Sequence, residues 1–219
     1  KISLNKAKSL KLPENLILIA GTTDSNAGFI ASNASEDEGV TVLGSTIVIK
    51  KIANQPLIFN GISNHQVGGK WIIGGASNTG GCVLKKFFSD EELDELSKQI
   101  NPGFESGIDL FPLASKGERF PINDDNLMPI LTPRPTSDAL YLHALLEGLA
   151  KIEKQGWEKL HKEGITYPKR IITIGKGALN FQWQKIREKI IGIPIKKTSK
   201  PTAMGVAMIA LEAIKLPQS

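Results

Sequence analysis

The chain has 219 residues, of which 41% are hydrophobic and 22% are charged, so a globally disordered chain is excluded. The single cysteine, Cys82, excludes a disulfide framework within the chain, and no apolar run approaches the ~20 residues that span a bilayer. The net charge of +5 is mild and the lysines are not interleaved with aromatic residues, so we expect neither a nucleic-acid nor a membrane partner. Since the chain begins with Lys1 and shows no signal-peptide pattern, we expect a processed protein or a piece of a longer one.

The first element of the chain combines an apolar run with a capping motif. Leu16–Ala20 is apolar, too short for a helix and closed by Gly21, which predicts a buried strand. The following "TTDS" supplies side chains that cap a short helix over "NAGFIAS". Asp24 therefore stands at a predicted strand-to-helix junction, where it serves either as a helix cap or as a catalytic base.

The next stretch predicts a sheet. Gly39–Ile52 contains two β-branched runs around "LGS", which predicts two paired strands, and Trp71–Ile73 predicts a third. The glycine-rich "GGASNTGG" then leads into "CVLKKFF", which we expect to be helical. The first third of the chain is thus predicted as β-α-β-β-β-α.

The middle of the chain holds two helices around an irregular segment. Ser89 to Glu92 fits a capping box at the start of one helix, and Ser137 begins the longest helix. Residues 102–136 carry six of the twelve prolines, which predicts an irregular insertion. The insertion contains "GERFP", for which we favour a structural role.

The last part of the chain returns to alternating elements. Ile171–Ile174 predicts a strand, followed by a glycine-containing turn and a helix with Trp183 on its apolar face. "IPIKKTS" predicts a short edge strand, and "TAMGVAMIALEAI" predicts the final helix. Strands followed by turns and helices favour an α/β domain with a mixed sheet flanked by helices.

Small polar loops recur at the predicted ends of strands: "AGTTDSNAG", "LGST", "GGASNTGG" and "IGKGALN". Glycines at such junctions let the backbone approach a phosphate, and helix N-termini favour an anion. One loop alone is explained by an ordinary tight turn, but several together favour a polyphosphate ligand. No P-loop or G-x-G-x-x-G occurs, and the scattered histidines with one cysteine give no metal site. We expect His143 and Cys82 to serve packing.

Taken in order, "GTTDSNAGFIAS", "VLGSTIVIK", "GGASNTGG", "GERFP", "HALLEGLAKIE" and "GKGALNFQWQKIREKIIGIPI" resemble the C-terminal half of the FGGY carbohydrate kinases. These motifs are most similar to those of the cyanobacterial and plant ribulose- or xylulose-kinase-like branch. The resemblance runs from about Leu16 to Ile214. It implies an actin-like ATPase fold of the ribonuclease H type over residues 16–219. Residues 1–15 would then be a start segment that follows an N-terminal domain absent from this chain.

The resemblance also implies roles for single residues. Asp24 matches the general base, which also contacts the sugar. Gly44 and Ser45 match the segment around the β- and γ-phosphates, and Gly81 matches a helix-start glycine near the nucleotide. The adenosine turn is matched by Gly175, Gly177 and Asn180, and Trp183 matches an aromatic residue that stacks on adenine, with core packing as its alternative. Lys176 replaces the middle glycine of that turn, where its side chain either meets a phosphate or crowds adenine.

These matches imply an enzyme that, with its N-terminal domain, transfers the γ-phosphate of ATP to a sugar hydroxyl with Mg²⁺. The sugar would be a ketopentose, D-ribulose or D-xylulose, and the isolated chain would be inactive. The alternative is a non-catalytic relative that binds nucleotide or sugar as a sensor or assembly module; an actin-like ATPase of the chaperone or filament type is a third. The resemblance implies a cytoplasmic protein, or a stromal one in a plant, and leaves a homodimer open.

Overall fold

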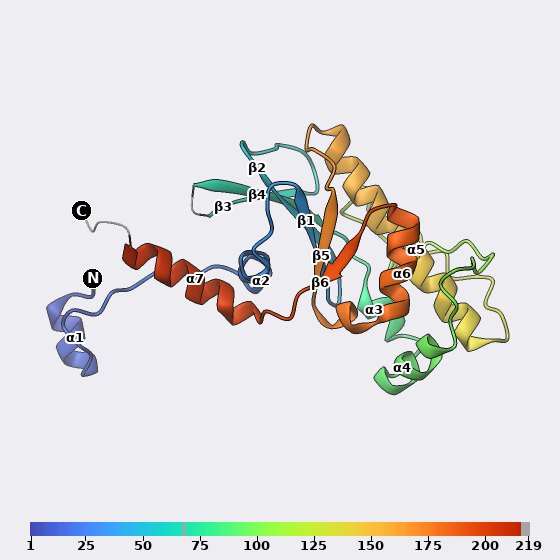
Figure 1. Ribbon diagram of the computed structural model, residues 1–219, viewed down its shortest axis with the longest axis horizontal. Helices are drawn as coiled ribbons and strands as arrows, with labels where there is room; N and C mark the ends of the chain where they lie inside the picture. The colour runs from blue at the N-terminus through green and yellow to red at the C-terminus, as the bar shows by residue number, and fades with distance from the viewer. Residues whose placement is uncertain (68, 216–219) are drawn as a thin grey trace. The chain divides into compact units, whose positions relative to one another are not determined.

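A computed structural model describes residues 1–67 and 69–215 (Figure 1). The chain divides into two compact units. The larger unit holds Ser32–Ser199, and the smaller one combines Lys1–Ala31 with the chain from Lys200 onward.

The larger unit is built on a mixed sheet with the strand order β3-β4-β2-β1-β5-β6. Its strands are β1 (Glu38–Leu43), β2 (Ile47–Ala53), β3 (Ile62–Val67), β4 (Lys70–Ala76), β5 (Arg170–Ile174) and β6 (Ile195–Lys197). The pairs β1–β2, β2–β4 and β3–β4 are antiparallel, whereas β1–β5 and β5–β6 are parallel. The predicted pair of strands in residues 39–52, the strand around residues 71–73, the strand before the glycine turn and the edge strand are therefore confirmed.

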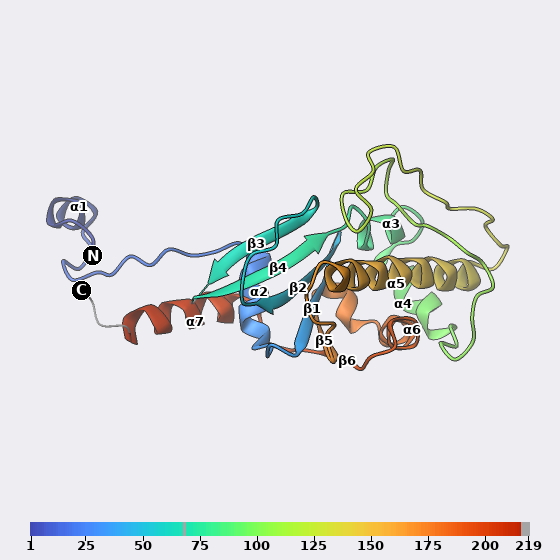
Figure 2. The same ribbon diagram turned by 90° about the horizontal axis from the view of Figure 1, so that it is seen from above.

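Helices of the larger unit pack on this sheet and on one another. They are α3 (Gly81–Leu84), α4 (Asp90–Lys98), α5 (Asp138–Lys162), the 3₁₀ helix η1 (Lys176–Leu179) and α6 (Phe181–Ile191). The long helix α5 lies beside α6 in both views (Figures 1 and 2). Its small residues allow close packing: Gly148 lies against Leu110 and Pro112, and Gly156 lies against Phe120 and Ile49 of β2. The hydrophobic core is thus centred on α5.

Side-chain caps fix where the helices begin, as the sequence predicts. The Ser89 hydroxyl accepts the amide of Glu92, and the Glu92 carboxylate accepts the amide of Ser89, which completes the capping box of α4. The Ser137 hydroxyl accepts the amide of Leu140 at the start of α5. Such caps satisfy amides that have no partner inside the helix.

A buried polar network joins the helices α5 and α6 to the strands β1 and β5. Arg187 of α6 donates from Nε to Glu153 Oε2 at 2.6 Å and from Nη2 to Glu153 Oε1 at 2.8 Å. The Thr41 hydroxyl of β1 donates to Glu153 at 2.6 Å, and Thr173 of β5 accepts from Arg187 at 2.8 Å. At least 98% of each residue is buried, so the charges depend on one another rather than on water. The network fixes α5 and α6 against the sheet.

Residues 102–136 are mostly irregular and run beside α5 (Figure 2). Two isolated bridges, Phe111 with Ile130 and Glu118 with Asp124, are the regular pairings described within this segment. The segment nonetheless contributes Leu110 and Phe120 to the core, so it is a packed part of the larger unit.

The smaller unit contains α1 (Leu4–Leu10), most of α2 (Asp24–Ser32) and α7 (Thr202–Lys215). Gly205 of α7 lies in close contact with the backbone of Ala27 in α2. The predicted helices over "NAGFIAS" and "TAMGVAMIALEAI" are confirmed. Along residues 1–67 and 69–215, no helix combines the length and the apolar character needed to cross a bilayer.

The prediction of a strand at Leu16–Ala20 is wrong. This run is irregular, and Leu18 is 65% exposed. An apolar run forms a strand only where a neighbour supplies ladder hydrogen bonds, and no strand of the described residues pairs with it. Neither α1 nor β3 is predicted from the sequence.

Candidate functional site

The candidate site starts at the tight turn between β1 and β2. Gly44 and Ser45 form the exposed part of this turn. Within the part of the chain that the structure describes, the backbone amides of Ser45 and Thr46 donate no hydrogen bond. Two free amides and a serine hydroxyl on an exposed turn are donors that suit an anion.

A second loop, residues 77–82, is bonded to this turn. The amide of Gly81 donates to the carbonyl of Gly44 at 3.0 Å, and the amide of Cys82 donates to the carbonyl of Ser45 at 3.0 Å. A Cβ on Gly81 would stand only 2.8 Å from that Gly44 carbonyl oxygen. The approach of the two loops therefore requires glycine at position 81.

Glu118 of the "GERFP" segment binds the second loop through hydrogen bonds. Glu118 is 1% exposed, and its carboxylate accepts the Ser77 hydroxyl at 2.5 Å and the Asn78 amide at 2.8 Å. It also accepts the amide of Phe120 at 3.2 Å. We therefore interpret the structural role of this segment as follows: Glu118 positions the loop that carries Gly81.

The third loop, residues 175–180, follows β5. Gly175 has a φ of +94°, and a Cβ at this position would lie 2.5 Å from the carbonyl oxygen of Leu43, so both its backbone and its surroundings require glycine. Asn180 caps α6 by accepting the amide of Trp183 at 2.9 Å. Its Nδ2 also donates to the Ser97 hydroxyl of α4 at 2.7 Å. The loop is therefore fixed both to the end of β1 and to α4.

The three loops meet because β1 and β5 are parallel neighbours, with Val42 opposite Ile174. Ligands of α/β proteins bind where the carboxyl ends of such strands meet the following loops. Of the predicted residues, Gly44, Ser45, Gly81, Gly175, Gly177 and Asn180 all belong to these three loops. The cluster offers backbone amides, a hydroxyl and an amide side chain, which together can bind a phosphate chain and a polar base or sugar.

Trp183 is only 3% exposed and belongs to the hydrophobic core. Its ring packs on Gly177, where a Cβ would lie 2.6 Å from Cζ3. Of its two predicted roles, this burial favours core packing. Stacking on adenine would require the ring to leave the core.

Lys176 extends from the third loop to α4. Its ammonium lies 2.7 Å from Asp90 Oδ2, and Lys85 lies 3.4 Å from the same oxygen. The hydrogen bond with Lys176 lowers the pKa of Asp90, and the same bond raises the pKa of Lys176. The side chain is therefore directed to a carboxylate on the protein surface.

Asp24 belongs to the smaller unit. It is the first residue of α2, is exposed, and its Oδ1 accepts the amide of Ser25 at 2.6 Å. This arrangement fits a helix N-terminus, where a carboxylate is favourable. Its role as a general base stays a prediction.

Two further candidate groups, Cys82 and His143, lie in packed surroundings. Burial raises the pKa of the Cys82 thiol, which makes a nucleophilic thiolate less available. His143 is buried in α5, 3.3 Å from Glu147. In residues 1–67 and 69–215, no three His, Cys, Asp or Glu side chains are grouped to hold a metal ion.

Comparison with known proteins gives one family and a consistent set of structures. The C-terminal domain of the FGGY family of carbohydrate kinases matches residues 39–214. The chain superimposes with a TM-score of 0.81 on ligand-bound xylulose kinase from Lactobacillus acidophilus, at 20% identity, covering 100% of this chain and 47% of that one. Xylulose kinase from Bifidobacterium adolescentis gives 0.74 at 22% identity, covering 93% and 43%. Plasmodium falciparum glycerol kinase with ADP gives 0.69 at 18% identity, covering 90% and 42%.

The chain therefore has the α/β fold of about half of such a kinase, which is an actin-like ATPase domain. This confirms the predicted fold class. At these identities the structural likeness concerns the fold, and it does not resolve a branch of the family.

Proposed function

Because this chain belongs to the FGGY family of carbohydrate kinases and matches their C-terminal domain, we propose that it is the nucleotide-binding half of an ATP-dependent sugar kinase. The observation that carries the proposal is the bonding of the turn at residues 44–46 to the loop at residues 77–82, together with the contact of Gly175 and Gly177 with the adjacent Leu43. The chain spans about half the length of the kinases it resembles in structure. The proposed partners are therefore the protein's own N-terminal domain, ATP and a sugar.

The residues of the three loops have distinct tasks in this proposal. The free amides of Ser45 and Thr46 and the Ser45 hydroxyl bind the β- and γ-phosphates. Gly81 lets the second loop approach that turn, and Glu118 prevents this loop from moving. Gly175, Gly177 and Asn180 form the adenosine side of the site. Catalysis of phosphoryl transfer consists mainly of such positioning and charge stabilisation.

Mg²⁺ neutralises the phosphate charge when it is bound with ATP. Since the described residues offer no group of three ligands, we assign Mg²⁺ to the phosphates and to the other half of the enzyme. Asp24 accepts the proton of the sugar hydroxyl, and the proposed acceptor is a ketopentose, D-ribulose or D-xylulose. This choice follows the resemblance to the ribulose- or xylulose-kinase-like branch, and the proposed location is the cytoplasm or, in a plant, the plastid stroma.

The proposal is tested with the full two-domain enzyme, ATP and a panel of ketoses, aldoses and polyols. We expect turnover with a ketopentose, and a loss of about 10²–10⁴-fold in kcat for Asp24→Asn. Asp138→Asn is the matched control, because Asp138 is also the acidic first residue of a helix. Full turnover of Asp24→Asn would show that the base is another residue.

The non-catalytic alternative is separated by calorimetry with a non-hydrolysable ATP analogue. Binding without turnover of any sugar would favour a sensor or an assembly module. Under the proposal, the 219 residues alone have no kinase activity, because they form only one side of the site. Turnover by this chain alone would contradict the assignment as half of an enzyme.

A further inference from the structure

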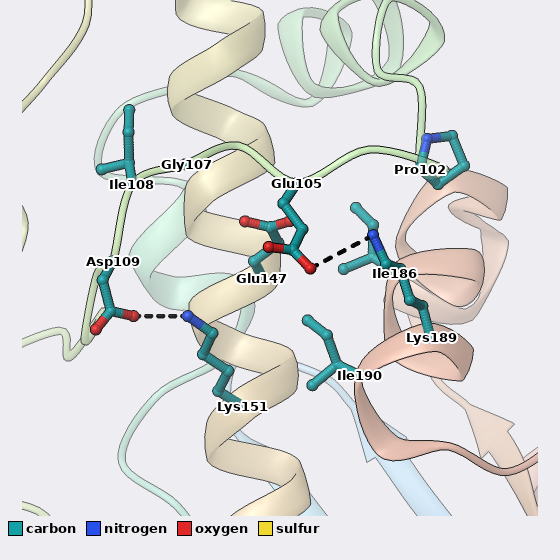
Figure 3. Close-up of a pocket in the computed structure, with 10 residues that line it drawn as sticks. All are labelled: Pro102, Glu105, Gly107, Ile108, Asp109, Glu147, Lys151, Ile186, Lys189 and Ile190. Atoms are coloured by element: carbon teal, nitrogen blue, oxygen red, sulfur yellow. Dashed lines mark hydrogen bonds and ion pairs between the residues drawn. The ribbon is translucent and has the colours of Figure 1, made fainter.

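A cavity lies in the larger unit between α5, α6 and the segment 102–109 (Figure 3). Its volume is about 320 Å³, which is within the range of small-molecule sites. Ile186 and Ile190 of α6 and Ile108 of the segment supply apolar walls. No residue of the three candidate loops lines this cavity, so it is separate from the proposed nucleotide site.

Charged groups at the rim of the cavity are arranged in pairs. Lys151 of α5 lies 2.6 Å from Asp109, and Lys189 of α6 lies 3.7 Å from Glu105 (Figure 3). Each pair joins a helix to the segment 102–109, and all four side chains are exposed. Since each lysine is matched by one carboxylate, the rim carries no net charge.

Glu147 is the one remaining charged residue of the lining, and it is 7% exposed. Burial raises the pKa of its carboxyl group, but the adjacent His143 ring and the hydrogen bonds from Ser106 outweigh burial and leave the pKa below its usual range. The carboxylate is therefore ionised at neutral pH. A cavity with a neutral rim thus contains one negative charge in its wall.

The carboxylate of Glu147 still has acceptor capacity. The Ser106 amide donates to both oxygens at 3.2 Å, and the Ser106 hydroxyl donates to Oε2. His143 Nε2 lies 3.3 Å from Oε1, but within the described part of the chain it makes no hydrogen bond. A carboxylate has about four lone-pair positions, and two hydrogens from Ser106 do not fill them.

We propose that this cavity binds a small organic ammonium ion, with the amine on Glu147 and an apolar body against Ile108, Ile186 and Ile190. A buried carboxylate favours a donor that also carries a positive charge, since such hydrogen bonds are about twice as strong as neutral ones. The isoleucines favour a hydrocarbon body rather than a free metal ion or a sugar. The site does not depend on the proposed kinase function.

The probe is cyclohexylmethylamine, compared with cyclohexylmethanol and with cyclohexanecarboxylate, which share its ring but are neutral or anionic. Affinities are measured by calorimetry on the 219-residue chain, and the site is located by amide chemical shifts. We expect the amine to bind at least about tenfold more tightly than the alcohol. We expect the largest shifts in residues 105–109, 147–151 and 186–190.

Two variants test the assignment of the groups. Glu147→Gln keeps the size of the side chain and an acceptor for Ser106, and we expect the preference for the amine to disappear. Ile190→Trp fills the cavity, and we expect it to abolish binding of both the amine and the alcohol. Glu95→Gln is the matched control, because Glu95 is an exposed helical glutamate and the variant should bind like the parent chain.

Equal affinities for the three probes, tighter binding of the carboxylate, or shifts outside the cavity would overturn the proposal. So would undiminished amine preference in Glu147→Gln, since Glu147 would then serve only to hold Ser106. If Glu147→Gln fails to fold, Ile190→Trp together with the shifts decides the outcome. Each readout is direct binding, so the result does not depend on whether the kinase assay succeeds.

Discussion

Two ion pairs near the candidate site have almost the same length but different surroundings. Arg187 and Glu153 lie 2.6 Å apart with side chains that are 1% and 0% exposed. Lys176 and Asp90 lie 2.7 Å apart with side chains that are 69% and 43% exposed. Water replaces a lost partner at the surface but not in the core, so distance alone does not measure the importance of a pair. We therefore expect loss of one partner of the buried pair to lower the free energy of unfolding strongly. Loss of Lys176 from the exposed pair should mainly change the pKa of Asp90.

The largest effect is expected for Glu153→Ala. This change leaves the Arg187 guanidinium buried without its bidentate partner, and it leaves the Thr41 hydroxyl without an acceptor. We expect the free energy of unfolding to fall by about 3–5 kcal/mol, measured by urea denaturation.

The control is the double variant Glu153→Leu with Arg187→Met, which removes both charges. We expect it to be more stable than Glu153→Ala, because no buried charge is left unpaired. If the two variants were equally unstable, the loss would come from packing rather than from the unpaired charge.

The second effect is expected for Glu118→Ala. It removes the acceptor of the Ser77 hydroxyl and of two amides in a buried place. We expect a loss of about 2–3 kcal/mol in thermal denaturation and weaker binding of an ATP analogue, since the loop with Gly81 loses its support. Glu118→Gln keeps acceptor oxygen and should recover part of both losses. Unchanged nucleotide affinity in Glu118→Ala would separate this loop from the proposed site.

A smaller effect is expected for Asn180→Ala, which removes the cap of α6 and the bond to Ser97. We expect a loss of about 1 kcal/mol in the free energy of unfolding. Asn180→Ser keeps a capping oxygen but does not reach Ser97 in the same way, so it should restore stability more than nucleotide affinity. Equal behaviour of both variants in calorimetry would contradict a direct role of the amide in binding adenosine.

The smallest effect on stability is expected for Lys176→Ala, because both partners are exposed. The lowered pKa of Asp90 means that its pair contributes above the carboxyl's unfolded pKa of about 3.9 and is lost as the pH falls through the lower folded value. Removal of Lys176 should therefore raise the pKa of Asp90, measured from its carboxyl shifts in an NMR titration. Lys98→Ala is the control, since Lys98 pairs with Glu95 instead. An unchanged Asp90 pKa would mean that Lys85 alone sets it.

Local patterns in the sequence were sufficient for most of the sheet and most helices. The β-branched runs around "LGS" and the capping box at Ser89 depend on neighbours within a few residues, so they could be predicted. β3 could not, because "SNHQ" has no strand pattern and pairs only because β4 lies beside it. Leu16–Ala20 failed for the opposite reason, since it has the composition of a strand but no partner.

The same distinction applies to the candidate site. The small polar loops could be predicted from the sequence because glycine at strand ends is a local signal, and the family resemblance then selected Gly44, Gly81 and Gly175 within them. Glu118 could not be assigned to the loop at residues 77–79, which it contacts from about 40 residues away in the chain. Glu153 and Arg187 are 34 residues apart, Thr173 lies 14 residues from Arg187, and Thr41 lies 112 residues from Glu153, so only the fold brings the four together.

The two outermost strands of the sheet, β3 and β6, have a consequence for handling the protein at high concentration. An exposed edge strand is a template on which another chain can add a strand and begin to aggregate. β6 is three residues long and carries Lys196 and Lys197, while β3 is largely polar and its Asn64 bonds both the amide and the carbonyl of Leu57. Charge, shortness and a covering segment therefore protect both edges against intermolecular strand addition.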